Sequence, residues 1–179
     1  MAATATPYRS QNWALTKPAA RGKHGIVVSQ SREAAEAGTK ILEQGGNAAD
    51  AADAACFALA AVEPWNSGLG GIGFAVVLKA GESRAKVVDF GPVAPRHADP
   101  ADYPLTGGPT AEGFFGWPGV KEDRNILGPH SIAVPGLVSG LALAHRTYGR
   151  LPWGDLVQPA IALAERGLGL LAEIGGDLH

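Results

Sequence analysis

Apolar side chains recur every three to four residues in four segments of the chain, which predicts four helices. Two of them follow one another before position 64. The second of these carries alanine on almost every side, so we expect it to be buried. The other two are predicted over Leu137–Tyr148 and between Pro152 and Gly167. Two helix pairs therefore flank the middle of the chain.

Residue types at the ends of the first helix pair define its boundaries. Ser31 can cap the first helix, because its hydroxyl can accept a hydrogen bond from a free backbone N–H. Gly45 can end that helix, because glycine adopts the left-handed conformation at little cost. Asn47 and Asp50 have nearly the spacing of a capping box at the start of the second helix, which Pro64 ends.

Short apolar runs predict one strand before the first helix pair and three strands between the two pairs. The runs are 25–29, 74–78, 86–90 and 131–134. Gly81 and Glu82 lie between the second and third runs and indicate a hairpin turn, so these two strands are expected to be antiparallel.

The remaining segments lack periodicity. Residues 1–24 are predicted to form an extended N-terminal arm, and 25–179 to form part of one domain that contains a long loop over 91–130. Within that loop, the aromatic segment 113–117 is interpreted as an anchor that packs down. Helix pairs beside an antiparallel hairpin indicate an α+β layered fold.

Composition narrows the class of protein. The net charge is −2 and no basic run occurs, so nothing favours nucleic acid or an anionic membrane as a partner. The longest apolar stretch is too short to span a bilayer. No signal peptide is evident, which favours the cytoplasm, or the periplasm if a leader has been removed. The single cysteine, Cys56, excludes an internal disulfide and is interpreted as a small buried residue.

The candidate chemical motifs are weak when taken one at a time. Gly68, Gly70 and Gly73 match the dinucleotide pattern G-x-G-x-x-G, but a helix precedes them and a strand follows, which is the reverse of the order that pattern needs. Asp50 and Asp53 are interpreted as residues of a helix start, not as an acid–base pair. The histidines are dispersed, so no metal site is expected, and neither a cofactor nor a nucleophile with its base is indicated.

An ordered set of segments resembles the large subunit of the gamma-glutamyltransferases, which are N-terminal-nucleophile hydrolases. These segments are 25–29, 43–51, 62–64, 67–73, 89–90, 94–95, 134–136, 140–141, 148–149, 151–153 and 159–164. Each is weak alone, but together they follow the family's order through most of 25–168.

The resemblance implies an αββα sandwich that is completed by a second chain cut from the same precursor. That second chain would begin with the catalytic threonine, whose own amine acts as its base. No family-like Thr-Thr-His segment occurs here, so no catalytic residue is assigned to this chain. The expected assembly is a heterodimer, or a dimer of heterodimers. Because the chain is short for a large subunit, it is interpreted as a fragment, a divergent short subunit or a subunit cut again.

One departure from the family concerns the substrate. Members that bind glutamyl groups carry an arginine directly after the Asp-Phe pair, where it holds the substrate carboxylate. Here that position is Gly91, and the next arginine is Arg96 in the following loop. Either Arg96 reaches the site, or the enzyme does not bind a glutamate carboxylate there. Both residues are therefore candidate substrate-binding positions.

The resulting hypothesis is an amide hydrolase or acyltransferase that acts on a non-glutamyl amide, such as a cephalosporin side-chain amide or oxamate. Two alternatives stay open. One is a true gamma-glutamyltransferase that hydrolyses glutathione, and the other is a non-catalytic remnant of the family.

Overall fold

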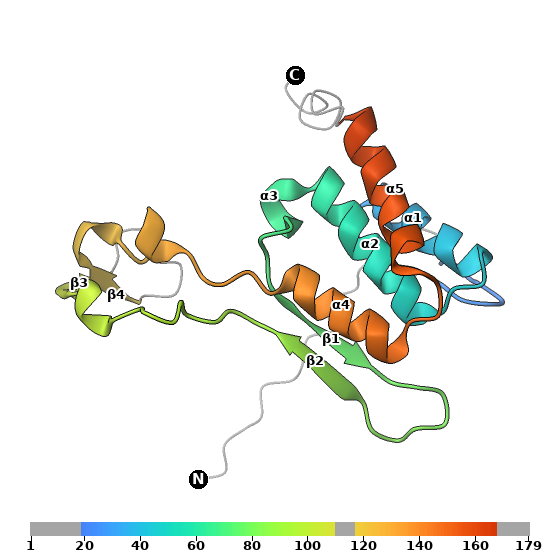
Figure 1. The fold of residues 1–179 in the computed structure, drawn as a ribbon, viewed down its shortest axis with the longest axis horizontal. Coiled ribbons are helices and arrows are strands. Elements are labelled where there is room, and N and C mark those ends of the chain that lie inside the picture. Colours follow the sequence, from blue (N-terminus) through green and yellow to red (C-terminus); the bar gives the residue numbers. More distant parts are fainter. Residues whose placement is uncertain (1–18, 110–116, 168–179) are drawn as a thin grey trace, which may run out of the picture.

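The computed structural model describes residues 19–109 and 117–167. Residues 1–18 of the predicted arm, most of the aromatic segment 113–117 and everything after 167 lie outside this description. A group of helices lies beside a two-stranded hairpin, and a long projection carries a second, smaller pair of strands away from it (Figure 1). The prediction of a mixed α+β fold is confirmed.

The first helix, α1 (Arg32–Glu43), has the ends that the sequence predicts. The hydroxyl oxygen of Ser31 accepts a hydrogen bond from the backbone N–H of Ala34 at 3.4 Å. Gly45 follows the helix with φ of +91°, a conformation that favours glycine.

The second helix, α2 (Ala48–Val62), begins with a complete capping box. The side-chain oxygen of Asn47 accepts from the N–H of Asp50 at 3.1 Å, and the Asp50 carboxylate accepts from the N–H of Asn47 at 2.9 Å. Pro64 does more than end α2. It begins the one-turn helix α3 (Pro64–Ser67), because proline is compatible with the first position of a helix.

Small residues allow α1 and α2 to pack closely. A Cβ atom added at Gly38 of α1 would lie 2.8 Å from the carbonyl oxygen of Ala51 of α2, which is closer than real Cβ atoms approach. The last helix, α5 (Trp153–Arg166), completes this layer and contributes Leu156, which is fully buried. The main core cluster consists of Ile41, Ala51, Ala54 and Leu156.

The predicted hairpin is present as β1 (Gly73–Val77) and β2 (Lys86–Phe90), which pair antiparallel with Phe74 opposite Asp89. The helix α4 (Leu137–Tyr148) contacts both strands and has the bounds that the sequence predicts. One face of the hairpin is turned toward α4. The opposite face is exposed and largely apolar, and carries Phe74, Val76 and Val87.

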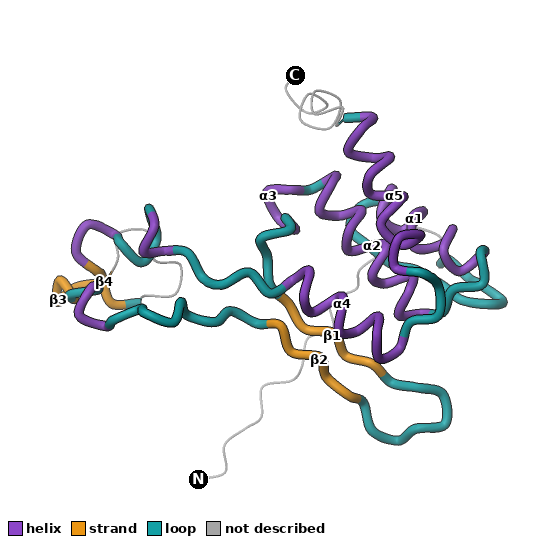
Figure 2. Tube along the Cα trace, in the orientation of Figure 1, coloured by secondary structure: helices purple, strands orange, loops and turns teal. Residues whose placement is uncertain are grey.

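Between β2 and α4 the chain runs out along the projection and returns. Val93 on the outgoing segment and Val134 on the returning segment form a single β-bridge. Beyond it lie β3 (Leu105–Pro109) and β4 (Pro118–Val120), which pair antiparallel, with short 3₁₀ turns nearby (Figure 2). Within 91–109 and 117–130 the chain thus has more regular structure than its sequence indicates, because backbone hydrogen bonds hold these strands without an apolar repeat.

Two predicted strands are wrong. Residues 131–134 contribute only the bridge at Val134. Residues 25–29 lie against the helices with Val27 packed on the main core cluster, and no strand within 19–109 or 117–167 pairs with them. An apolar run becomes a strand only where a neighbouring backbone completes the ladder.

None of the helices in the described ranges is both long and apolar enough to cross a bilayer.

Candidate substrate-binding cleft

A cleft of about 680 Å³ opens where β2 ends and the projection begins. Its walls come from the end of the hairpin, the two segments of the projection and one side of α4. The lining includes Phe74, Asp89, Gly91, Ser139 and Arg146.

Glycines allow α4 to lie directly on the end of β2. A Cβ atom at Gly136 would lie 2.5 Å from the carbonyl oxygen of Phe90, and one at Gly140 would overlap the Phe90 ring. The carbonyl oxygen of Gly71 accepts hydrogen bonds from the N–H groups of Gly136 at 3.1 Å and Leu137 at 2.9 Å. These close contacts hold the cleft walls at a fixed separation.

Packing accounts for only part of the G-x-G-x-x-G sequence, since a Cβ atom at Gly73 would lie 2.7 Å from the Phe90 ring, whereas one at Gly70 would meet nothing within 4 Å. The order predicted for it is confirmed, since α3 precedes the turn and β1 follows it. A dinucleotide site needs free N–H groups at a helix start. The start of α4 contacts this turn, and the N–H groups of Gly136 and Leu137 there already donate to the carbonyl oxygen of Gly71. The turn therefore serves as a packing element.

Gly91 lies in the cleft wall, and its surroundings are tight. Its N–H donates to Oδ1 of Asp89 at 2.9 Å. A Cβ atom added here would lie 3.0 Å from Cζ of Phe74 and 3.1 Å from Oδ1 of Asp89. A larger side chain at position 91 would therefore need the exposed Phe74 ring to shift.

The structure separates the two residues predicted to bind substrate. Gly91 lines the cleft, whereas Arg96 is exposed on the projection and is not among the lining residues. The cation that does line the cleft is Arg146 of α4, which belongs to no motif in the sequence. Helical phase was the available signal, because Ser139 and Arg146 lie on the side of α4 opposite the buried Leu141 and Ala144.

The cleft offers binding groups without a nucleophile and base. The hydroxyl of Ser139 donates to the carbonyl oxygen of Gly136 at 2.8 Å, within its own helix. The lining contains no histidine or cysteine among the described residues. Nor do the described residues contain a group of three or more potential metal ligands. The described part of the cleft thus offers polar groups that can bind a ligand, namely those of Asp89, Ser139 and Arg146.

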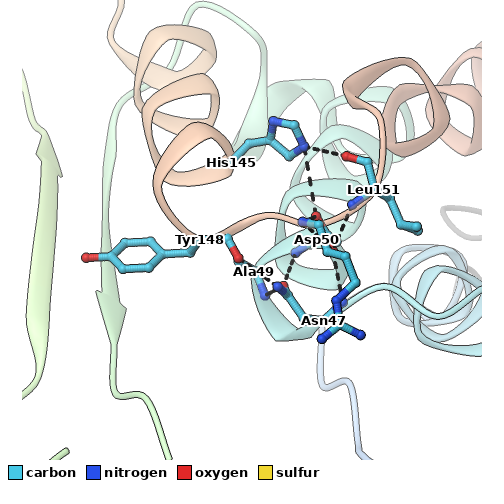
Figure 3. Close-up of polar contacts among 7 residues, drawn as sticks. Asn47, Ala49, Asp50, His145, Tyr148 and Leu151 are labelled. Atoms are coloured by element: carbon cyan, nitrogen blue, oxygen red, sulfur yellow. Dashed lines mark hydrogen bonds and ion pairs between the residues drawn. The ribbon is translucent and has the colours of Figure 1, made fainter.

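A second polar cluster lies away from the cleft, where α2 begins (Figure 3). The buried Asp50 carboxylate accepts hydrogen bonds from the backbone N–H groups of Asn47, Arg150 and Leu151 at 2.9 to 3.4 Å. His145 donates from Nε2 to the carbonyl oxygen of Leu151 at 2.7 Å, and this atom lies 3.9 Å from Oδ1 of Asp50. The cluster ties the start of α2 to the connection between α4 and α5. Asp50 therefore has the structural role that the sequence predicts.

Asp53 differs from the interpretation as a helix-start residue. It is only 2% exposed, and its Oδ2 atom is buried without a hydrogen-bond partner. Burial raises the pKa of its carboxyl group to about 7, His145 acts to lower it and the Asp50 charge raises it. Cys56 is half-buried, so it is less enclosed than the expected buried residue, although partial burial still raises the pKa of its thiol.

Known proteins with similar sequences include glutathione hydrolases and acylases. A model of the gamma-glutamyltranspeptidase family matches residues 34–178. Glutathione hydrolase 3 of Arabidopsis thaliana is 34% identical over 86% of this chain and 22% of its own length. Acylase ACY 1 proenzyme of Pseudomonas sp. (strain SE83) is 35% identical over 89% of this chain and 28% of its own length. The chain thus spans about a quarter of these relatives.

Solved structures that resemble this chain include a gamma-glutamyltranspeptidase and a cephalosporin acylase. Helicobacter pylori gamma-glutamyltranspeptidase superimposes with a TM-score of 0.70 and 36% identity, over 84% of this chain and 40% of that one. Cephalosporin acylase from Bacillus halodurans superimposes with a TM-score of 0.64 and 28% identity, over 86% of this chain and 27% of that one.

Proposed function

Because the chain belongs to the gamma-glutamyltranspeptidase family, we propose that it is part of an enzyme that cleaves an amide and transfers the acyl group to water or to an amine. A threonine at the start of a second chain attacks the amide carbonyl, and its own amine accepts the hydroxyl proton. The amine of the substrate takes up that proton and leaves, and water or an acceptor amine then releases the acyl group from the threonine. The chain described here supplies one wall of the substrate site.

The exposed face of the β1–β2 hairpin supports the proposed second chain. Phe74, Val76 and Val87 are 62%, 69% and 60% exposed, and the pairing of the strands brings them together on one face. Soluble proteins rarely leave such a contiguous apolar surface to water. A second sheet against this face would complete an αββα sandwich.

The surroundings of Gly91 support the proposal that the substrate is an amide whose acyl group is not glutamyl. An arginine at this position would need the Phe74 ring to move, since even a Cβ atom would lie 3.0 Å from it. The cleft wall is therefore built without the guanidinium that the family resemblance places there. The alternative of a true glutathione hydrolase has support from sequence, since relatives of that name and acylases are about equally similar to this chain.

Two measurements test the proposal on the complete precursor. Intact mass and N-terminal sequencing should reveal a second chain that begins with threonine, and a precursor that stays uncut would contradict the mechanism. γ-Glutamyl p-nitroanilide should be cleaved slowly relative to anilides of other acyl groups. Fast turnover of the γ-glutamyl compound would instead support the glutathione hydrolase alternative.

A further inference from the structure

We propose that the cleft at the end of β2 binds a free carboxylate on the acyl part of the substrate, and that the Arg146 guanidinium holds it. This inference rests on the proposed amide-cleaving function and narrows its substrates to acyl groups that carry a negative charge. It assigns the binding role to a residue of α4, about fifty positions beyond Gly91.

The position of Arg146 makes it available to a ligand. Ser139, Leu143 and Arg146 are spaced four and three residues apart, so they form one stripe along α4, and all three line the cleft. The Arg146 side chain is exposed, and it forms no ion pair with any residue of 19–109 or 117–167. A guanidinium in this state can offer two parallel N–H donors to a carboxylate.

The opposite wall carries no cation among the described residues. A Cβ atom at position 91 would lie 3.0 Å from Cζ of Phe74, so a longer side chain there needs the exposed Phe74 ring to shift. The other charged group in the lining is Asp89, and its Oδ1 already accepts the N–H of Gly91 at 2.9 Å. A bound acyl chain would thus have an aromatic ring on one side and the Arg146 charge on the other.

The test uses matched substrates and matched arginine variants of the complete processed enzyme. Glutaryl p-nitroanilide carries a terminal carboxylate, and pentanoyl p-nitroanilide has a methyl group in its place. In R146Q, kcat/KM for the glutaryl compound should fall about ten-fold or more, while kcat/KM for the pentanoyl compound stays within about two-fold, because one charge-assisted contact is lost. R146K should recover part of the loss. R96Q is the control, and it should leave both values unchanged.

Binding of glutarate, measured by calorimetry, gives a readout that does not need turnover. The wild-type protein should bind glutarate about ten-fold more tightly than R146Q does, and R96Q should match the wild type. Equal binding by wild type and R146Q, equal losses on both anilides, or a loss confined to R96Q would overturn the assignment.

The two proposals fail in different ways. If no anilide is cleaved, the proposed function fails, and glutarate binding still decides the role of Arg146. If γ-glutamyl p-nitroanilide is cleaved fast and R146Q slows it selectively, Arg146 keeps its role and the non-glutamyl assignment falls.

Discussion

The unpartnered carboxyl group of Asp53 predicts an unusual dependence of stability on pH. In the folded chain its pKa is about 7, against 3.8 for an ordinary aspartate, because burial disfavours the charged form. A group with a raised folded-state pKa binds its proton more tightly when the protein is folded. Its stabilising contribution is complete below pH 3.8, declines as the pH rises through the interval up to about 7, and is absent above it.

The magnitude follows from the shift of roughly three pKa units. At about 1.4 kcal/mol per unit, ionisation of Asp53 should lower the free energy of unfolding by about 4 kcal/mol across the whole interval. Between pH 5 and pH 8, about two of those units are crossed, so the decline should be about 3 kcal/mol. Asp53→Asn keeps the size of the side chain without the ionisation and should remove this slope.

The assay is urea denaturation of the assembled protein at several values between pH 5 and pH 8, followed by circular dichroism. The difference between wild type and Asp53→Asn cancels the contributions of other titrating groups. An Asp155→Asn variant, in which an exposed carboxylate in the first turn of α5 is replaced, serves as the comparison. Parallel stability curves for wild type and Asp53→Asn would refute the reasoning.

Four further substitutions test the packing, the proposed assembly and the proposed substrate. Gly140→Ala places a methyl group into the ring of Phe90 and should cost about 1 to 3 kcal/mol in urea denaturation. Gly154→Ala, where nothing lies within 4 Å, should instead stabilise α5 by up to about 1 kcal/mol, and a loss there would contradict the helix packing. Val76→Asp, on the exposed face of the hairpin, should prevent co-purification of the second chain while circular dichroism stays unchanged, and normal co-purification would argue against a covering sheet. Gly91→Arg should lower kcat/KM for every acyl anilide and should not create γ-glutamyl activity. A gain of that activity would show that the wall can adapt.

Local signals predicted most of the regular structure. The helix over Leu137–Tyr148 and the capping box of Asn47 and Asp50 are as expected, because caps and helical phase act over a few neighbouring residues. The prediction of a strand at 25–29 was wrong, because a strand forms only when it pairs with another strand. The residues of 25–29 do not reveal whether such a partner lies beside them.

The candidate site was predicted only in part. Gly91 was singled out because it departs from a family pattern at a defined position; it lines the cleft, and its role in binding stays a prediction. The meeting of Asp50 with the backbone of Arg150, a hundred residues further along the chain, depends on how α2 and α4 pack, and no spacing in the sequence reports that. Arg146 was overlooked because a charged residue on an exposed helix face usually lies in solvent. Only the structure shows that this face of α4 lies beside the end of β2, where Arg146 lines the cleft.

The single bridge between Val93 and Val134 makes the outer part of the projection a separable module. At this point the outgoing and returning segments are adjacent, with the N–H of Val134 donating to the carbonyl oxygen of Val93 at 2.9 Å. A short glycine-containing turn could therefore splice the two segments and remove 94–133 without changing the register of β1 and β2. The segment 94–133 could therefore be replaced by another sequence, in evolution or by design, while the helices and the β1–β2 hairpin keep their structure.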